Sequence, residues 1–130
     1  MRNNWKIIYY EDENSKSEVL DYINSLKETE QSKIFSWITI LEENGPNLPR
    51  PYSDLLEDGI HELRIKVTGK QVRILYFFCY KEFIILTNKF EKKSDKVPKN
   101  EILKAKEIRK RFLLKYNNYK KLLEVYNENP

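Results

Sequence analysis

The stretch HELRIKVTGKQVRILYFFCY, residues 61–80, contains two apolar patterns on either side of a turn. In its first part, Leu63, Ile65 and Val67 alternate with polar residues, which is the period of a half-buried strand. The VTGK sequence at residues 67–70 is typical of a tight turn, and residues 71–80 form a second strand-like run. This stretch therefore predicts two antiparallel strands.

The segments on both sides of residues 61–80 complete an α+β order of elements. Downstream, a tight connection at residues 81–82 leads to a third strand at residues 83–90, so that the three strands form an antiparallel β-meander. Pro98 suits the first turn of a C-terminal helix that runs from Lys99 onward. Upstream, the aromatic and β-branched residues 5–10 predict an N-terminal strand.

Two amphipathic helices occupy the interval between the N-terminal strand and the meander. Their apolar residues recur at the spacing i, i+3, i+4, i+7: Val19, Tyr22, Ile23 and Leu26 in the first, and Ile34, Trp37, Ile38 and Leu41 in the second. We expect the first helix to open at Asn14 or Ser15, and the second to have Thr29 as its N-cap and to end at Asn44-Gly45-Pro46. A loop with three prolines follows. The pair forms a helical hairpin, and we expect the helices to cover one face of the sheet.

The length and composition fit one hydrophobic core. Of 130 residues, 40% are hydrophobic and 34% charged, so we expect one domain over residues 1–116 with a helical extension of the same domain over residues 117–130. The sequence has no apolar run long enough to span a membrane and no secretion signal in its first residues. Together with the lone Cys79, which cannot form a disulfide within the chain, these features predict a soluble cytoplasmic protein with no membrane partner.

The net charge of +4 conceals opposite charges in two parts of the chain. Residues 1–60 contain 6 Lys and Arg against 12 Asp and Glu, whereas residues 61–121 contain 18 against 6. The basic part coincides with the predicted meander and last helix, which favours a folded surface for a polyanionic partner. On charge alone, a solvated surface is the alternative.

The residue types argue against several kinds of catalysis. His61 is the only histidine, no acidic pair has a recognisable ligand spacing, and the three glycines are isolated. The sequence therefore predicts no metal, no cofactor, no nucleophilic triad and no phosphate-binding loop. RNA cleavage needs none of these, because the ribose 2′-hydroxyl supplies the nucleophile and cationic side chains can stabilise the charged phosphorane.

Two arginines of the meander are candidates for that task. Arg64 alternates with the apolar residues of its strand, so the pleat directs it away from them. Arg73 shares its face with Leu75 and Phe77, where a guanidinium group needs a partner or a function. An ion pair with Glu62 across the sheet and a role in phosphate chemistry are both consistent with this position.

The segment that leaves the third strand, NKFEKKSDK at residues 88–96, combines four lysines with Phe90. Lysines can hold phosphates, and an aromatic ring can stack on a base. The segment is therefore a candidate RNA-binding element. A solvated loop with Phe90 in the core is the alternative.

Three patches of sequence together resemble the phage-derived Gp49-like branch of the RelE/ParE toxin superfamily, to which HigB-type toxins belong. They are LLEDGIHELR at residues 55–64, VRILYFF at residues 72–78, and KFEKK at residues 89–93 continuing through Pro98, Glu101, Ile102 and Ala105. The resemblance runs from about Trp5 to Leu114. It implies a RelE-like fold, ribosome-dependent cleavage of mRNA, and a helix-turn-helix antitoxin of the HigA kind that binds the toxin in a dimer or heterotetramer.

The resemblance also implies roles for individual residues of a basic cleft. Arg64, Arg73 and Lys93 would be catalytic, and Phe90, Lys92 and, more weakly, Lys89 and His61 would contact RNA. Lys96, from the lysine-rich segment at residues 88–96, is a further candidate for RNA contact. Asn88 stands near the place where this branch often has a histidine, and an amide cannot shuttle a proton. Glu101 and Tyr76 remain as candidates for acid and base.

Two other functions stay open at this point. A module that binds nucleic acid without cutting it would use the same basic cleft. The ParE branch of the superfamily poisons gyrase instead of cutting RNA.

Beyond Leu114, the helical spacing continues in an aromatic stripe of Tyr116, Tyr119, Leu123 and Tyr126. Such stripes are usually covered. We expect this one to dock on the body of the protein, with a dimer or antitoxin contact as the alternative.

Overall fold

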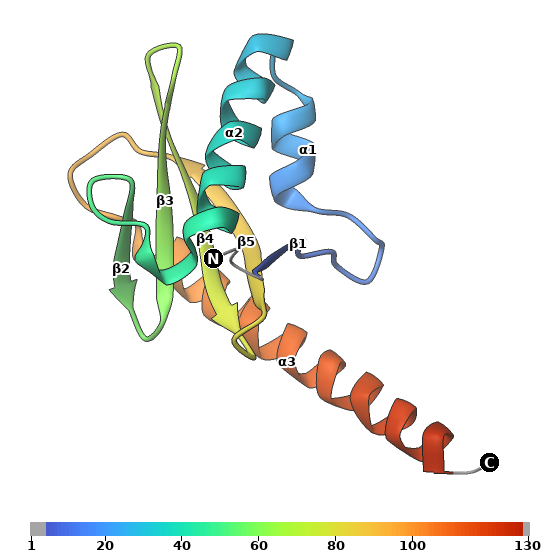
Figure 1. Cartoon of the computed structure of the whole chain (residues 1–130). Coiled ribbons are helices and arrows are strands. Elements are labelled where there is room, and N and C mark those ends of the chain that lie inside the picture. The colour runs from blue at the N-terminus through green and yellow to red at the C-terminus, as the bar shows by residue number, and fades with distance from the viewer. Residues whose placement is uncertain (1–4, 129–130) are drawn as a thin grey trace.

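The computed structural model describes the backbone of residues 5–128 and the side chains of residues 5–117. Its elements, in chain order, are β1 (Lys6–Tyr9), α1 (Glu18–Asn24), α2 (Glu28–Asn44), the short 3-10 helix η1 (Gly45–Asn47), β2 (Ser53–Glu57), β3 (Ile60–Val67), β4 (Lys70–Cys79), β5 (Phe83–Glu91) and α3 (Lys99–Glu128) (Figure 1). This order confirms the predicted α+β fold, with an N-terminal strand, a helical hairpin, an antiparallel meander and a C-terminal helix. It is consistent with a RelE-like fold.

The strands form one five-stranded sheet in the order β1-β5-β4-β3-β2. β1 pairs with β5 in parallel, whereas the other neighbouring strands are antiparallel. The sequence predicts a loop at residues 53–57, and here the prediction is wrong. β2 has only five residues and is followed at once by a turn at Asp58 and Gly59, both of which have positive φ. A strand this short shows too few periods to be distinguished from a loop.

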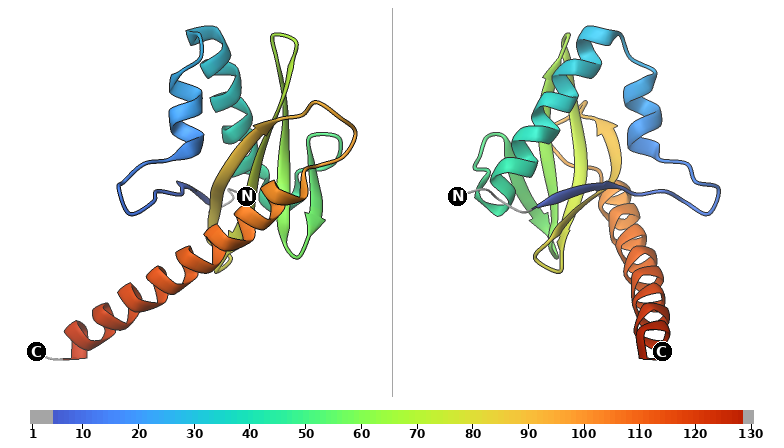
Figure 2. Two further views of the ribbon diagram at one scale, coloured as in Figure 1. Left: turned by 180° about the vertical axis from the view of Figure 1, so that it is seen from behind. Right: turned by 45° about the vertical axis from the view of Figure 1, so that its right-hand side comes forward.

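Helices cover both faces of the sheet, so the prediction of one covered face is also wrong. α1 and α2 pack on the face that contains Ile65 and Ile74, whereas α3 packs on the face that contains Leu75 and Phe77. Seen from behind, α3 crosses in front of the sheet, on the side away from α1 and α2 (Figure 2). The two faces are named the α2 face and the α3 face below.

α1 begins later in the chain than predicted. The Asp12 carboxylate accepts the N–H of Asn14 at 2.8 Å, which holds Asn14 and Ser15 in a turn. The helix starts at Glu18, with Ser17 as its N-cap. A short polar side chain that bonds the backbone locally can therefore postpone a helix.

α2 begins slightly earlier than predicted. Its N-cap is Lys27, and the Glu30 carboxylate accepts the Lys27 N–H at 3.3 Å. Thr29 consequently lies inside the first turn and is not the N-cap. The helix ends at Asn44, as predicted, and Gly45 with its positive φ turns the chain.

α3 packs on the sheet with its N-terminal part, and its C-terminal part extends beyond the sheet (Figures 1 and 2). Tyr116 stacks on Tyr80 with 4.7 Å between the ring centroids. Tyr119, Leu123 and Tyr126 lie outside the residues whose side chains are described. Docking of this stripe on the body therefore stays a prediction.

Candidate nucleic-acid interface

Three of the residues indicated by the resemblance lie in one line across the α3 face. Arg64 on β3 is directly opposite Arg73 on β4, and Arg73 is opposite Phe90 on β5. The strand register is sufficient to create this line, because directly opposite residues of antiparallel strands project to the same face.

Acidic residues alternate with arginines beside this line. Asp54 on β2 lies 2.7 Å from Arg50 and 3.1 Å from Arg64. Glu62 lies 2.9 Å from the Nε of Arg64 and 3.6 Å from the Nε of Arg73. These five residues are named the arginine row. It contains three guanidinium and two carboxylate groups, so it keeps a positive charge while the carboxylates hold the guanidinium groups in place.

Arg73 and Glu62 form the buried end of the arginine row. Glu62 is fully buried and Arg73 is 7% exposed. Arg73 Nε and Glu62 Oε1 have no hydrogen-bond partner in the described part of the chain, while the Nη atoms of Arg73 donate to the Val72 carbonyl and to Gln71 Oε1. Burial lowers the pKa of Arg73, Glu62 opposes this shift, and Arg64 adds to it. The ion pair with Glu62, one of the two interpretations of Arg73, is present.

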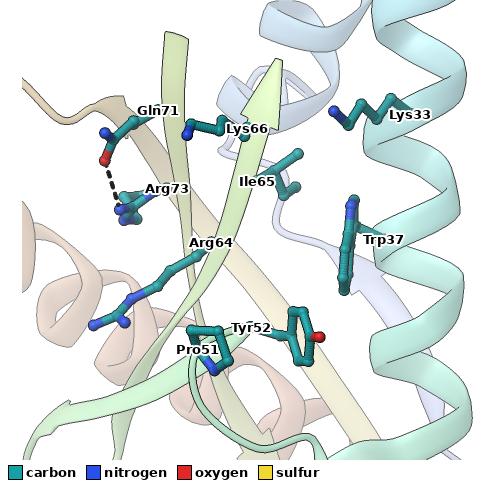
Figure 3. A pocket seen from close by; sticks show the side chains of 9 residues that line it. All are labelled: Lys33, Trp37, Pro51, Tyr52, Arg64, Ile65, Lys66, Gln71 and Arg73. Carbon is teal, nitrogen blue, oxygen red and sulfur yellow. Dashed lines mark hydrogen bonds between the residues drawn. The ribbon is translucent and has the colours of Figure 1, made fainter. Parts of the chain in front are cut away.

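A cavity of about 480 Å³ borders the arginine row. Arg64, Lys66 and Arg73 line it from the sheet, and Trp37 of α2 and Tyr52 before β2 line it opposite them (Figure 3). β2 begins at Ser53, which pairs with Leu63, so the last part of β3 has no neighbouring strand on that side. The cavity runs around this free edge of β3. A cavity with guanidinium groups in its wall can bind a phosphate through charge-assisted hydrogen bonds.

The predicted lysines after β5 lie in the loop that leads to α3. The Lys92 N–H donates to the Gln71 carbonyl at 2.7 Å, which holds the start of this loop beside β4. Lys92 is half-buried, and Lys93 and Lys96 are exposed. Their ammonium groups are therefore accessible to phosphates.

Phe90 lies below the surface. It is 8% exposed and packs with Leu75 and Ala105 in the core of the α3 face. It therefore presents little ring surface to a base, in agreement with the core position that the sequence left open for it.

His61 and Lys89 lie on the α2 face, away from the arginine row. The His61 ring stacks on Tyr76 with 5.2 Å between the centroids, and burial lowers the pKa of His61 while Asp54 opposes the shift. Lys89 Nζ lies 4.8 Å from the ring centroid of Tyr22. The structure does not bring these two predicted residues together with the others.

The candidates for acid and base have other surroundings than the arginines. Tyr76 is buried in the core of the α2 face, and burial raises its pKa to about 12. Asn88 is fully buried, and its amide donates to the carbonyl oxygen and to the carboxylate of Glu101, at 3.2 Å and 3.1 Å. Asn88 and Glu101 thus connect β5 to the first turn of α3.

Sequence reasoning missed Asp54, Trp37 and Tyr52. Asp54 lies in the strand that was predicted as a loop, and Trp37 belongs to the apolar stripe of α2, where a core position is the simpler interpretation. A signal existed for Tyr52, because an aromatic residue next to Pro51 suggests an ordered loop. Its position beside Trp37 depends on the tertiary fold.

Two features are absent from the residues that the structure describes. Among them, no three His, Cys, Asp or Glu side chains are grouped so that they could hold a metal ion. In the same part of the chain, no helix is both long and apolar enough to cross a membrane.

The fold and the arginine row define a class, a small α+β protein with a cationic cavity at the free edge of an antiparallel meander. The chain belongs to the Gp49-like family, because the family described as phage derived protein Gp49-like (DUF891) matches residues 21–110. The match contains the whole arginine row and confirms the resemblance in the sequence. It supports a phage-derived, toxin-like protein. No curated protein matches the chain.

Proposed function

We propose that this protein is the toxin of a type II toxin–antitoxin system and that it cuts mRNA on the ribosome. The observation that carries the proposal is the cross-strand pair of Arg64 and Arg73, which the buried Glu62 holds beside a cationic cavity. Membership of a phage-derived, toxin-like family supports it. The protein would then act in the cytoplasm, where ribosomes are.

The proposed chemistry uses the nucleophile of the RNA itself. The 2′-hydroxyl gives its proton to water and attacks the adjacent phosphorus. The bond from phosphorus to the 5′-oxygen breaks, the leaving 5′-oxygen takes a proton from water, and a 2′,3′-cyclic phosphate remains. Arg64 donates to the non-bridging oxygens of the phosphorane, and Arg73 adds positive charge from the buried end of the arginine row. Because Asp54 and Glu62 hold the guanidinium groups before RNA binds, little reorganisation is needed at the transition state.

The lysines of the loop between β5 and α3 extend this surface. Lys93 would act with the arginines on the reacting phosphate, and Lys92 and Lys96 would hold the phosphates next to it. A helix-turn-helix antitoxin of the HigA kind, in a dimer or heterotetramer with the toxin, neutralises it by covering the same cationic surface.

Arg64→Gln tests the proposal, because glutamine keeps a polar side chain but removes the charge. We expect loss of growth inhibition and roughly 100-fold slower cleavage of mRNA in a reconstituted translation system. The matched control is Arg111→Gln. Arg111 is exposed on α3 and pairs with Glu107, away from the cavity. This control is expected to behave as wild type, and circular dichroism checks the fold of both variants.

Full toxicity of a folded Arg64→Gln variant would contradict the proposal. So would two results with the wild-type protein. RNA binding without cleavage would indicate a nucleic-acid-binding module, and cleaved DNA with intact messages would indicate a gyrase poison of the ParE kind.

A further inference from the structure

The cavity beside the arginine row has an aromatic end that the cleavage chemistry does not use. We propose that this end binds one nucleobase of single-stranded RNA, stacked on Tyr52, while the phosphate next to that base lies at Arg64. The inference rests on the proposed function, since it extends the same cavity from the reacting phosphate to a neighbouring nucleotide.

Tyr52 forms a platform that is ordered before any ligand binds. Its ring stacks on Trp37 with 5.1 Å between the centroids and 27° between the planes. Its backbone is fixed on both sides, because its N–H donates to the Pro49 carbonyl at 3.0 Å and its carbonyl accepts the Arg64 N–H at 2.9 Å. Even so, Tyr52 remains 43% exposed. A rigid aromatic ring with exposed surface is what base stacking requires, and little side-chain freedom is lost on binding.

The charges around Tyr52 suit a nucleotide. Four of the side chains that line the cavity are cationic, namely Lys33, Arg64, Lys66 and Arg73, and within the described residues its lining includes no carboxylate. Lys33 projects from α2 one turn before Trp37, and Figure 3 shows both residues on the α2 side of the cavity. In the part of the chain that the structure describes, neither Lys33 nor Lys66 belongs to an ion pair. Both ammonium groups are therefore free to meet phosphates on either side of the stacked base.

The free edge of β3 offers a second kind of occupant, an extended peptide that would add a strand to the sheet. The lining favours RNA over such a peptide. The aromatic platform and the cationic side chains are contiguous, and Arg64 belongs both to the cavity wall and to the arginine row. A strand of RNA can thus pass around the edge of β3 from Tyr52 to Arg64 without leaving a positively charged surface.

The test compares Tyr52→Ala with Tyr52→Phe, which keeps the ring, and with Phe35→Ala as a matched control. Phe35 is an aromatic residue of α2 that is 36% exposed and does not line the cavity. Binding is measured by fluorescence anisotropy with a labelled, single-stranded 2′-O-methyl RNA oligonucleotide, which lacks the attacking hydroxyl. We expect Tyr52→Ala to weaken binding about tenfold, and Tyr52→Phe and Phe35→Ala to change it less than about twofold. Thermal melting checks the fold of each variant.

A second probe is the same oligonucleotide with one abasic nucleotide, placed in turn at each position. At one position the abasic change should weaken binding to the wild-type protein about tenfold but leave binding to Tyr52→Ala nearly unchanged, because the stacking contact is already lost. RNA should also quench tryptophan fluorescence, and Trp37→Phe should remove that quenching.

The outcomes separate this inference from the proposed function. If Arg64→Gln still cuts RNA but Tyr52→Ala loses the abasic-sensitive binding, the base site stands and the catalytic assignment fails. If Tyr52→Ala binds the oligonucleotide as tightly as wild type, the base site is wrong. If Tyr52→Ala weakens only the binding of the antitoxin, the base site is also wrong, and the cavity is identified as a peptide site.

Discussion

Glu62 is the residue on which the geometry of the arginine row depends. It is fully buried and faces the guanidinium groups of Arg64 and Arg73, so one carboxylate orients two cations on neighbouring strands. A buried charge is tolerated only when it is paired, and the loss of one partner leaves the other charge uncompensated. Glu62 therefore couples the stability of the sheet to the position of the candidate catalytic arginines.

This coupling is measurable with a double-mutant cycle. We expect Glu62→Gln to lower the free energy of unfolding by about 3 kcal/mol, because it leaves the buried Arg73 without its carboxylate partner. Arg73→Met should cost less, because Glu62 keeps its ion pair with Arg64 at 2.9 Å. The double variant should lose at least about 1 kcal/mol less than the sum of the two single variants. Urea denaturation gives all four values. Strict additivity would mean that the 3.6 Å approach of Arg73 to Glu62 contributes nothing to folding.

His61 allows a separate prediction about pH, since it is the only histidine in the chain. Burial lowers its pKa from 6.5, so the folded protein favours the neutral ring more than the unfolded chain does. The stabilisation is therefore present above pH 6.5 and is lost as the pH falls below that value. We expect the free energy of unfolding to decrease from pH 7 to pH 5 by more in wild type than in His61→Phe, which keeps a ring against Tyr76.

Nuclear magnetic resonance checks the same residue directly, because a single histidine gives a single titration. A pKa at or above 6.5 would contradict the burial of His61 against Tyr76. It would also restore His61 as a charged group for RNA.

At the residue scale, the sequence was most informative where strand periodicity applied. The parity of Arg73 with Leu75 and Phe77 indicated a guanidinium group on a largely buried face, and Glu62 was identifiable as its partner. The stack of Trp37 and Tyr52 joins a helix to a loop, and no local pattern encodes such a contact. Side chains on one hairpin could therefore be predicted together, whereas those on separate elements could not.

At the scale of elements, the hairpin, the helices and the meander were predictable because each has a period of its own. The coverage of both faces was missed, although β4 carried a signal for it. Ile74 and Tyr76 face α2 while Leu75 and Phe77 face α3, so the strand is apolar in both phases and must be buried on both sides. The apolar residues in both phases of β4 are consistent with α3 on the face opposite the helical hairpin.

α3 leads to a prediction for a shortened chain, which tests whether the aromatic stripe docks on the body of the protein. A chain that ends at Asn117 keeps the stack of Tyr116 on Tyr80 and the 2.8 Å hydrogen bond from Tyr80 to Asn117. Because the helix beyond this point extends away from the sheet, we expect the melting temperature to stay within about 2 °C of wild type. A chain that ends at Ile108 loses Phe112 from the core and should melt far lower. A large decrease for the longer chain would show that the stripe docks on the body.

For the whole molecule, the opposite charges of the two parts of the chain gave only an incomplete prediction of the surface that would bind a polyanion. The basic part supplies β3, β4, β5 and α3, as expected for a folded cationic surface. The acidic part, however, supplies Lys33 and Tyr52 to the same cavity. A surface formed by both parts of a chain cannot be deduced from the net charge of either.

The parallel pairing of β1 with β5 also determines when the protein can be completed during its own synthesis. Residues 6–9 leave the ribosome early, but their partners are residues 83–86, so the N-terminal strand must wait for most of the chain. The arginine row needs only short-range pairing between Arg50 and Arg73, and contacts close in sequence form fastest. The arginine row can thus assemble in a nascent chain before the sheet that supports it is closed.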